Sequence, residues 1–195
     1  MLDHGDTLRT FIALPLPGDW TATLEDVIDE LDSAAPAGVR WVRPTGIHLT
    51  LKFLGATDPA LVSRILDGLL DSVGGAPGPA LSLSGLGTFH NRNNPRVIWA
   101  GVSGDMETLA NLQQRVETLA VGLGWAAERR PFRPHLTIGR VRDRISPRER
   151  KRLVTAISNC AVPRLPSWRP DAVRLYKSEL TPRGAIYTNL GEVEI

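Results

Sequence analysis

The sequence predicts an α+β fold with largely antiparallel strands, and three observations support this prediction. Strand-like and helix-like segments alternate along the 195 residues, and short turns typical of hairpins join several of them. The second half of the chain repeats the order of elements in the first half. The complete glycine pattern of a dinucleotide-binding or P-loop fold does not occur, which disfavours a doubly wound parallel sheet. We therefore expect one domain, residues 1–195, made of two similar interleaved lobes.

The first half shows strand and helix patterns in alternation. Apolar residues at helical spacing predict one helix after Asp19 and a second helix after Asp58. A linker rich in Gly and Pro follows the second helix. The strands expected in this half are 10–16, 39–42, 47–54, 81–84 and 97–102.

The second half follows the same plan. A helix is expected over 105–123 and a strand over 134–141. The next helix, 146–157, opens with the Ser-Pro-Arg-Glu pattern of a capping box. Two strands, 172–180 and 185–190, form a closing hairpin around a Thr-Pro-Arg-Gly turn.

The composition is that of an ordinary soluble globular protein, with 42% hydrophobic and 23% charged residues. The net charge is only +2, but cations are concentrated over 129–152, which is compatible with an anionic ligand. The single cysteine, Cys160, excludes an internal disulfide framework. The N-terminus lacks the basic region of a signal peptide, and the apolar run at 11–16 is too short to span a bilayer. A cytoplasmic protein without membrane association, and a monomer, is expected.

A repeated His-x-Thr element carries the functional prediction. His48-Leu49-Thr50-Leu51 and His135-Leu136-Thr137-Ile138 both lie in expected strands, at comparable places in the two halves. Side chains alternate across a strand, so each histidine shares a face with its threonine, while the apolar residues between them enter a core. Either copy alone is compatible with ordinary residues on a strand surface. The repetition favours one symmetric site with two imidazoles and two hydroxyls.

This set of groups suits displacement at phosphorus. Histidine has an ordinary pKa near 6.5, so one imidazole can serve as base for the incoming oxygen and the other as acid for the leaving oxygen. The hydroxyls of Thr50 and Thr137 can bind the non-bridging phosphate oxygens. Catalytic zinc usually has three protein ligands, and no third ligand stands at a matching position, so a metal-independent reaction is favoured. No other cofactor is indicated.

With these motifs, the chain resembles the two-histidine (2H) phosphoesterase superfamily, and within it the RNA 2′,3′-cyclic phosphodiesterases, also called 2′-5′ RNA ligases. The resemblance covers nearly the whole chain. It rests on Arg-Thr-Phe-Ile-Ala-Leu at 9–14, on His-Leu-Thr-Leu-Lys-Phe-Leu-Gly at 48–55, on Pro-Phe-Arg-Pro-His-Leu-Thr-Ile-Gly-Arg at 131–140 and on a closing hairpin at 175–187.

The resemblance implies two largely antiparallel sheets flanking a central cleft, with helices outside. It implies hydrolysis of RNA 2′,3′-cyclic phosphate ends to 2′-phosphates, without metal or nucleotide cofactor. His48 would be the proton donor to the departing O3′, and His135 the proton acceptor that activates water. The same chemistry in reverse, with a 5′-hydroxyl, would form a 2′-5′ linkage. RNA with a cyclic phosphate end is the expected partner, and no obligate protein partner is evident.

Five further residues are candidates for substrate contacts. Strand alternation places Lys52 on the face of His48 and Arg133 on the face of His135, where either could reach phosphate. The same alternation places Arg140 on the opposite face, where a structural role is expected. Arg130 is a weaker phosphate candidate. Phe89 could stack on a base, although core packing is an alternative for it, and the resemblance suggests that Tyr187 lines the cleft.

Two alternative functions remain open from the sequence. One is a 2H phosphodiesterase acting on a small cyclic nucleotide or a 2′-5′ oligonucleotide. The other is a non-catalytic RNA-binding module that has kept the fold. The intact His and Thr residues of both copies count against the second alternative.

Overall fold

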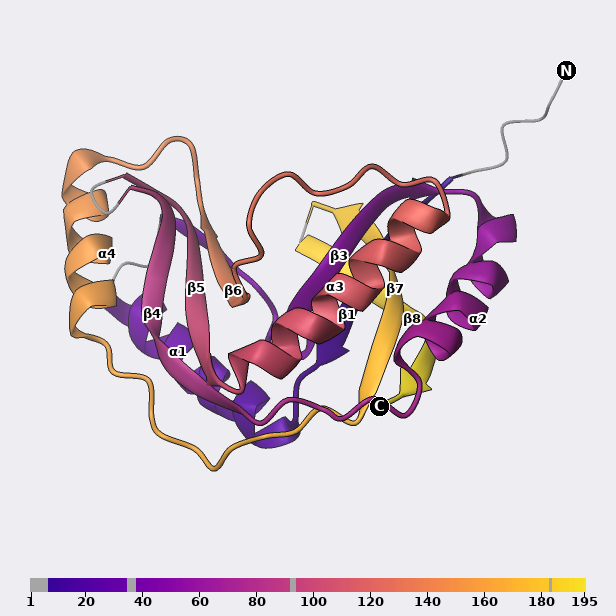
Figure 1. Ribbon diagram of the computed structural model, residues 1–195. Coiled ribbons are helices and arrows are strands. Elements are labelled where there is room, and N and C mark those ends of the chain that lie inside the picture. The colour runs from indigo at the N-terminus through magenta and orange to yellow at the C-terminus, as the bar shows by residue number, and fades with distance from the viewer. Residues whose placement is uncertain (1–6, 35–37, 92–93, 183) are drawn as a thin grey trace, which may run out of the picture.

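The computed structural model describes residues 7–34, 38–91, 94–182 and 184–195, which form a curled antiparallel sheet with four α-helices packed against it (Figure 1). The strands are β1 (Leu8–Pro15), β2 (Val39–Trp41), β3 (His48–Thr57), β4 (Leu81–Asn91), β5 (Asn94–Gly104), β6 (His135–Val141), β7 (Ala172–Thr181) and β8 (Gly184–Glu194). The helices are α1 (Gly18–Ala34), α2 (Val62–Val73), α3 (Met106–Gly122) and α4 (Pro147–Asn159), and 3₁₀ turns cover Pro44–Gly46 and Pro59–Leu61.

The expected α+β class with antiparallel pairing is confirmed, but the expectation of two separate sheets is wrong. The sheet is continuous, with strand order β4-β5-β6-β3-β1-β7-β8 and β2 paired with β6. Strands β4, β5 and β6 form one part of the sheet, and β3, β1, β7 and β8 form the other. The two parts join where β3 and β6 pair through Leu49 and Leu136. Hydrogen bonding across this short pair joins into one sheet the two sheets that the family resemblance implied.

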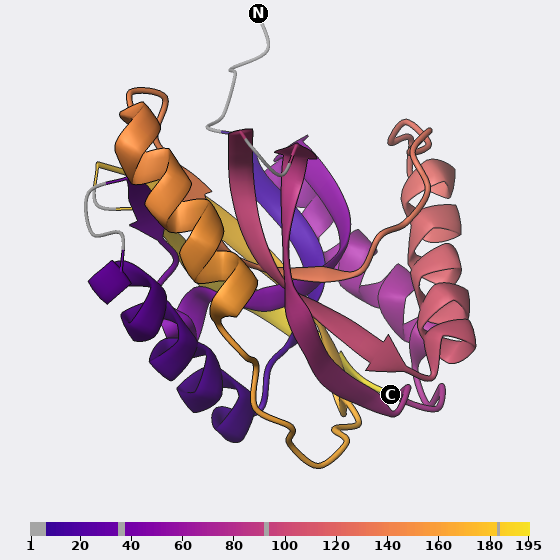
Figure 2. The ribbon, with the colours of Figure 1, turned by 90° about the vertical axis from the view of Figure 1, so that its left-hand side faces the viewer.

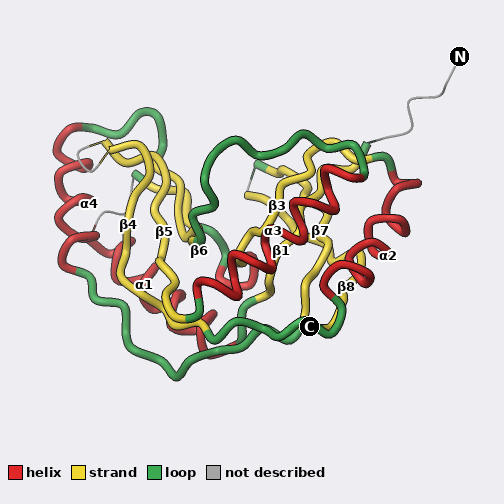
Figure 3. The backbone as a smooth tube through the Cα atoms, in the orientation of Figure 1, coloured by secondary structure: helices red, strands yellow, loops and turns green. Residues whose placement is uncertain are grey.

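The helices pack in two pairs. Helix α1 lies beside α4, and α2 lies beside α3, and the pairs cover different ends of the sheet, one on the left and one on the right in Figure 2. The tube in Figure 3 shows the strands curled between them. Apolar side chains at helical spacing explain this packing: Leu24, Val27 and Leu31 of α1, for example, are buried. We call the sheet surface that contacts these helices the helix-covered face, and the other surface the open face.

The predicted elements are confirmed, with differences at their ends. Helix α4 begins with the expected capping box, in which the Ser146 side chain accepts from the Glu149 backbone and the Glu149 side chain accepts from the Ser146 backbone. Strands β4 and β5 are longer than predicted and form a hairpin that includes Phe89. The first six residues, on which the signal-peptide argument rests, and Arg183 of the closing turn lie outside the described residues. Within the described part of the chain, none of the helices has the length and apolar character needed to cross a bilayer.

Candidate active site

The two motif strands are neighbours in the sheet. Strands β3 and β6 run antiparallel, and Leu49 pairs directly with Leu136. On either side of this pair the antiparallel direction brings His48 toward Thr137 and Thr50 toward His135. Both leucines are fully buried on the helix-covered face, so the histidines and threonines that alternate with them lie on the open face. The structure therefore brings the two His-x-Thr elements together on one surface.

The same hydrogen bond orients each histidine. Nδ1 of His48 lies 2.9 Å from the carbonyl oxygen of Gly46, and Nδ1 of His135 lies 2.6 Å from that of Arg133, two residues earlier in both cases. A carbonyl oxygen can only accept, so Nδ1 must be the protonated nitrogen in each neutral ring. This leaves Nε2 of both rings as the atom that can accept or donate a proton on the open face.

Burial lowers the pKa of both histidines. The pKa of His48 falls from 6.5 to about 4, mainly because the ring is removed from water, although the hydrogen bond to Gly46 opposes the shift. A charge on His135 lowers it further. The pKa of His135 is also lowered, by burial first and then by the charge of Arg140. In the ligand-free site both imidazoles are therefore neutral near neutral pH.

Aromatic rings pack around His48. The ring of Phe11, on β1, is stacked on His48 with centroids 4.5 Å apart, and Tyr187, on β8, meets His48 edge-on at 5.1 Å. Tyr176, on β7, is stacked with Phe11, and its ring centroid lies 6.1 Å from that of His48. These rings remove His48 from water and restrict its orientation, which is the physical cause of its lowered pKa. Tyr187 thus contacts His48, and its predicted contact with a substrate stays a prediction.

Around His135 the packing is lighter. Phe89 meets His135 edge-on with centroids 4.7 Å apart, and it also contacts Trp99 at 5.5 Å. Phe89 is half-buried rather than enclosed in the core. Its position beside His135 is compatible with stacking on a base of the substrate, and this contact stays a prediction.

A β-bulge interrupts both motif strands at the same position. In β3, Ile12 pairs with Lys52 but the next residue of β1, Ala13, pairs with Thr50, so Leu51 is extra. In β6, Ile98 pairs with Gly139 and Trp99 with Thr137, so Ile138 is extra. A bulge reverses the alternation of side chains beyond it. The fourth residue after each histidine therefore turns to the helix-covered face, and the fifth turns to the open face.

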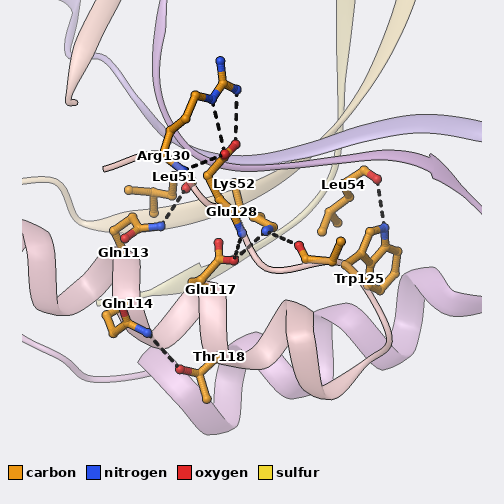
Figure 4. Close-up of polar contacts among 11 residues, drawn as sticks. Leu51, Lys52, Leu54, Gln113, Gln114, Glu117, Thr118, Trp125, Glu128 and Arg130 are labelled. Carbon is orange, nitrogen blue, oxygen red and sulfur yellow. Dashed lines mark hydrogen bonds and ion pairs between the residues drawn. The ribbon is translucent and has the colours of Figure 1, made fainter. Parts of the chain in front are cut away.

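The predicted location of Lys52 on the His48 face is wrong for this reason. The bulge turns Lys52 inward, where only 7% of it is exposed, and its Nζ lies 2.7 Å from Oε1 of Glu117 on α3. Lys52 also donates to the carbonyl oxygen of Ala126, and Glu117 accepts from the backbone of Glu128 (Figure 4). Lys52 thus ties β3 to α3 and to the following loop and is not available to a substrate. Phe53 takes its place on the open face and is 63% exposed.

The bulge in β6 has the opposite effect on Arg140. Sequence alternation placed it away from His135, but the bulge at Ile138 turns it to the open face, where it is exposed. Burial raises the pKa of Tyr187, and the charge of Arg140 opposes that shift; the same charge adds to the effect of burial in lowering the pKa of His135. The guanidinium therefore acts on both rings. Arg140 is therefore a site residue that the sequence argument missed. Gly139, unusual in the middle of a strand, is the signal that could have revealed the bulge, because Gly in a strand often marks one.

The other two predicted arginines lie in the segment before β6. The carbonyl of Arg133 orients His135, a backbone role that the sequence did not reveal, while its side chain is exposed. Arg130 forms an exposed ion pair with Glu128, with Nη2 and Oε2 3.3 Å apart (Figure 4). Contacts of these two side chains with a substrate stay predictions. Over the residues that the structure describes, no group of three or more His, Cys, Asp or Glu side chains is arranged to hold a metal ion.

Comparison with known families agrees with this duplicated arrangement. The family model described as LigT like Phosphoesterase matches the chain twice, at residues 14–99 and 102–187. One match contains His48 and the other contains His135, each at a similar distance from its start. The fold and the two matches define the class of protein as a phosphoesterase built from two related halves. The chain belongs to the LigT-like family of 2H phosphoesterases, as the motifs predicted.

Curated relatives extend over nearly the whole chain. An RNA 2′,3′-cyclic phosphodiesterase of Methanothermobacter thermautotrophicus is 36% identical over 183 residues, covering 94% of this chain and 96% of the relative. One from Thermotoga maritima is 32% identical over 187 residues, covering 96% of this chain and 95% of the relative. The predicted enzyme class, that of the RNA 2′,3′-cyclic phosphodiesterases, is thereby confirmed at the level of the family.

Solved structures confirm the fold. TT0787 of Thermus thermophilus is similar with a TM-score of 0.74 and 25% identity, covering 96% of this chain and 97% of that one. Escherichia coli LigT complexed with 3′-AMP is similar with a TM-score of 0.72 and 24% identity, covering 97% of this chain and 99% of that one.

Proposed function

We propose that this protein hydrolyses RNA 2′,3′-cyclic phosphate ends to 2′-phosphates by metal-independent acid–base catalysis with His48 and His135. The observation that carries the proposal is the pair of matching Nδ1–carbonyl hydrogen bonds, which leave two Nε2 atoms for proton transfer on one surface. The proposed substrate is inferred from the full-length relatives, which are RNA 2′,3′-cyclic phosphodiesterases.

The reaction is a single displacement at phosphorus. Nε2 of His135 takes a proton from water as the water oxygen bonds to phosphorus. The bond between phosphorus and O3′ breaks, and Nε2 of His48 gives its proton to O3′, leaving the phosphate on O2′. A 5′-hydroxyl of a second RNA in place of water would attack the same phosphorus, displace O3′ and give a 2′-5′ linkage. The assignment of donor and acceptor comes from the family resemblance.

The surroundings of the two rings are compatible with these roles. Burial, and after it the charge of Arg140, lowers the pKa of His135 and so favours the neutral ring that a base requires. His48 is neutral in the free site, so as the acid it must gain its proton when the anionic substrate binds. A bound anion favours the charged form of a nearby imidazole. The hydroxyls of Thr50 and Thr137 and the guanidinium of Arg140 are the groups that we assign to the non-bridging phosphate oxygens.

The test uses an RNA oligonucleotide with a 2′,3′-cyclic phosphate end, incubated with the protein in EDTA. We expect a 2′-phosphate product, and a failure to form it would contradict the proposed substrate, whereas loss of activity only in EDTA would contradict metal independence. A cyclic mononucleotide and a 2′-5′ oligonucleotide, assayed in parallel, address the alternative substrates.

Variants then test the two histidines. His48→Asn and His135→Asn keep a group that can donate to the same carbonyl but lack Nε2, and each should lower kcat by about 100-fold or more. His90→Asn, at an exposed histidine of β4, is the matched control and should leave kcat unchanged. Unchanged turnover in either active-site variant would contradict the mechanism.

A further inference from the structure

Two arginines stand directly opposite one another on the open face. Arg40 of β2 pairs with Arg140 of β6 in the antiparallel ladder. Directly opposed residues of such a pair lie on the same face with Cβ atoms about 4.5–5.5 Å apart, and like charges in that relationship destabilise a sheet. Arg40 therefore shares the face of His135 and Thr137, and both arginines are exposed.

In the part of the chain that the structure describes, no acidic side chain relieves this repulsion. The ion pairs formed among the described residues include neither Arg40 nor Arg140, although Arg96, Arg130 and Arg174 each have a carboxylate partner. Two opposed guanidinium groups without an acidic partner form a local positive potential that a phosphate would neutralise.

The backbone that carries the pair is firmly held. Trp41, next to Arg40, donates from Nε1 to Oδ1 of Asp32 on α1 at 2.6 Å, and Val42 donates to the carbonyl oxygen of Ile138 at 2.9 Å. Gly139 has no side chain, which lets the Trp41 ring pack against it, because a Cβ there would lie 2.8 Å from that ring. These contacts fix strand β2 beside β6 and hold the two arginines in register.

The location of β2 relates the pair to the catalytic surface. Strand β2 lies along the same edge of β6 as β3, with β3 pairing near the start of β6 and β2 near its end. Arg140 lies on β6, the strand that carries His135, whereas Arg40 lies across the ladder from it on β2. Arg40 is thus one strand further from His135 than Arg140 is.

We propose that Arg40, beside Arg140, binds the phosphodiester on the 5′ side of the terminal nucleotide and so makes the enzyme prefer RNA over a cyclic mononucleotide. This inference rests on the proposed function and deepens it, because a nucleoside 2′,3′-cyclic phosphate has no such phosphodiester. Phosphate contacts of this kind position a nucleic acid without reading its bases, so the preference is for chain length and not for sequence.

The experiment compares kcat/KM on a dinucleotide ending in 2′,3′-cyclic phosphate with kcat/KM on the matching nucleoside 2′,3′-cyclic phosphate. In Arg40→Gln the ratio of the two values should fall about tenfold, as expected when a charge-assisted hydrogen bond to phosphate is lost. Arg40→Lys should retain part of the ratio. Arg64→Gln, at an exposed position of helix α2, is the matched control and should leave the ratio unchanged.

Two measurements keep the outcome clear. If the wild type cleaves neither substrate, the proposed function fails, whereas an unchanged ratio in Arg40→Gln, with both substrates cleaved, overturns this inference alone. Thermal unfolding separates binding from structure: removing one of two opposed charges should leave Tm the same or higher. A lower Tm with an unchanged ratio would show that Arg40 is a structural residue.

Discussion

Burial lowers the pKa of His48, and a positive charge on His135 lowers it further, so protonation of His135 opposes protonation of His48. The aromatic packing around His48 causes much of this burial, and both imidazoles are therefore neutral near neutral pH before an anion binds. The mechanism that we propose needs one of them protonated. Under that proposal, the catalytic protonation state depends on a bound anion.

Anion binding should therefore take up protons. Sulfate is a suitable probe, because it is tetrahedral and does not titrate near pH 6. We expect its binding at that pH to take up a proton, up to about one per site, since a nearby anion raises the pKa of an imidazole. Calorimetry in two buffers of different ionisation enthalpy measures the uptake. It should be lost in His48→Asn, and binding without uptake in the wild type would show that His48 stays neutral.

The stability of the protein should depend on pH over the range set by His48. Its pKa is about 4 in the folded state, against 6.5 without the protein environment. Between these values the unfolded chain binds more protons, so the free energy of unfolding should fall as pH is lowered from about 6.5 to 4, by up to about 3 kcal/mol. Urea titrations should show a shallower pH dependence in His48→Asn and the full dependence in His90→Asn. Equal slopes in all three proteins would contradict the burial argument.

The two threonines should matter for kcat more than for folding. Thr50→Val and Thr137→Val keep the shape of the side chain and remove the hydroxyl that we assign to the phosphate oxygens. Loss of one such donor should lower kcat on the cyclic phosphate by about 100-fold. A matched change at Thr155, on α4, should have no effect on kcat. If both motif variants turned over like the wild type, Arg140 alone would have to hold the phosphate charge.

Sequence patterns predicted the elements and the pairing of the two motifs well, because apolar spacing and internal repetition are local and direct signals. Leu49 and Leu136 alternate with the motif residues, and their burial follows from that pattern. Alternation failed only beyond the third residue of each motif. A bulge is specified by the register with a neighbouring strand, at Ile12 and Ala13 for β3, and these partners are distant in sequence.

The same displacement by one residue explains both errors at the site. It turned Lys52 inward, although lysine is almost never fully buried without a partner, and the partner Glu117 lies on a distant helix. It placed Arg140 on the open face, whereas in a regular strand this side chain would lie on the helix-covered face. The position of Arg40 opposite Arg140 could not be predicted from the sequence either, because only the fold shows which residue of β2 pairs with which residue of β6.

The ion pair of Lys52 and Glu117 should stabilise the fold and take no part in the chemistry. Lys52→Met would leave Glu117 with a buried charge and should cost about 3–5 kcal/mol of unfolding free energy. In Lys52→Met/Glu117→Gln the charge is gone, while the amide oxygen can still accept from the Glu128 backbone, so much of the loss should be recovered. Urea unfolding measures both. Because Lys52 lies on the helix-covered face, kcat on a cyclic mononucleotide, corrected for the folded fraction, should match the wild type in the double variant. A kcat lowered 100-fold with stability restored would instead show that Lys52 acts on the open face.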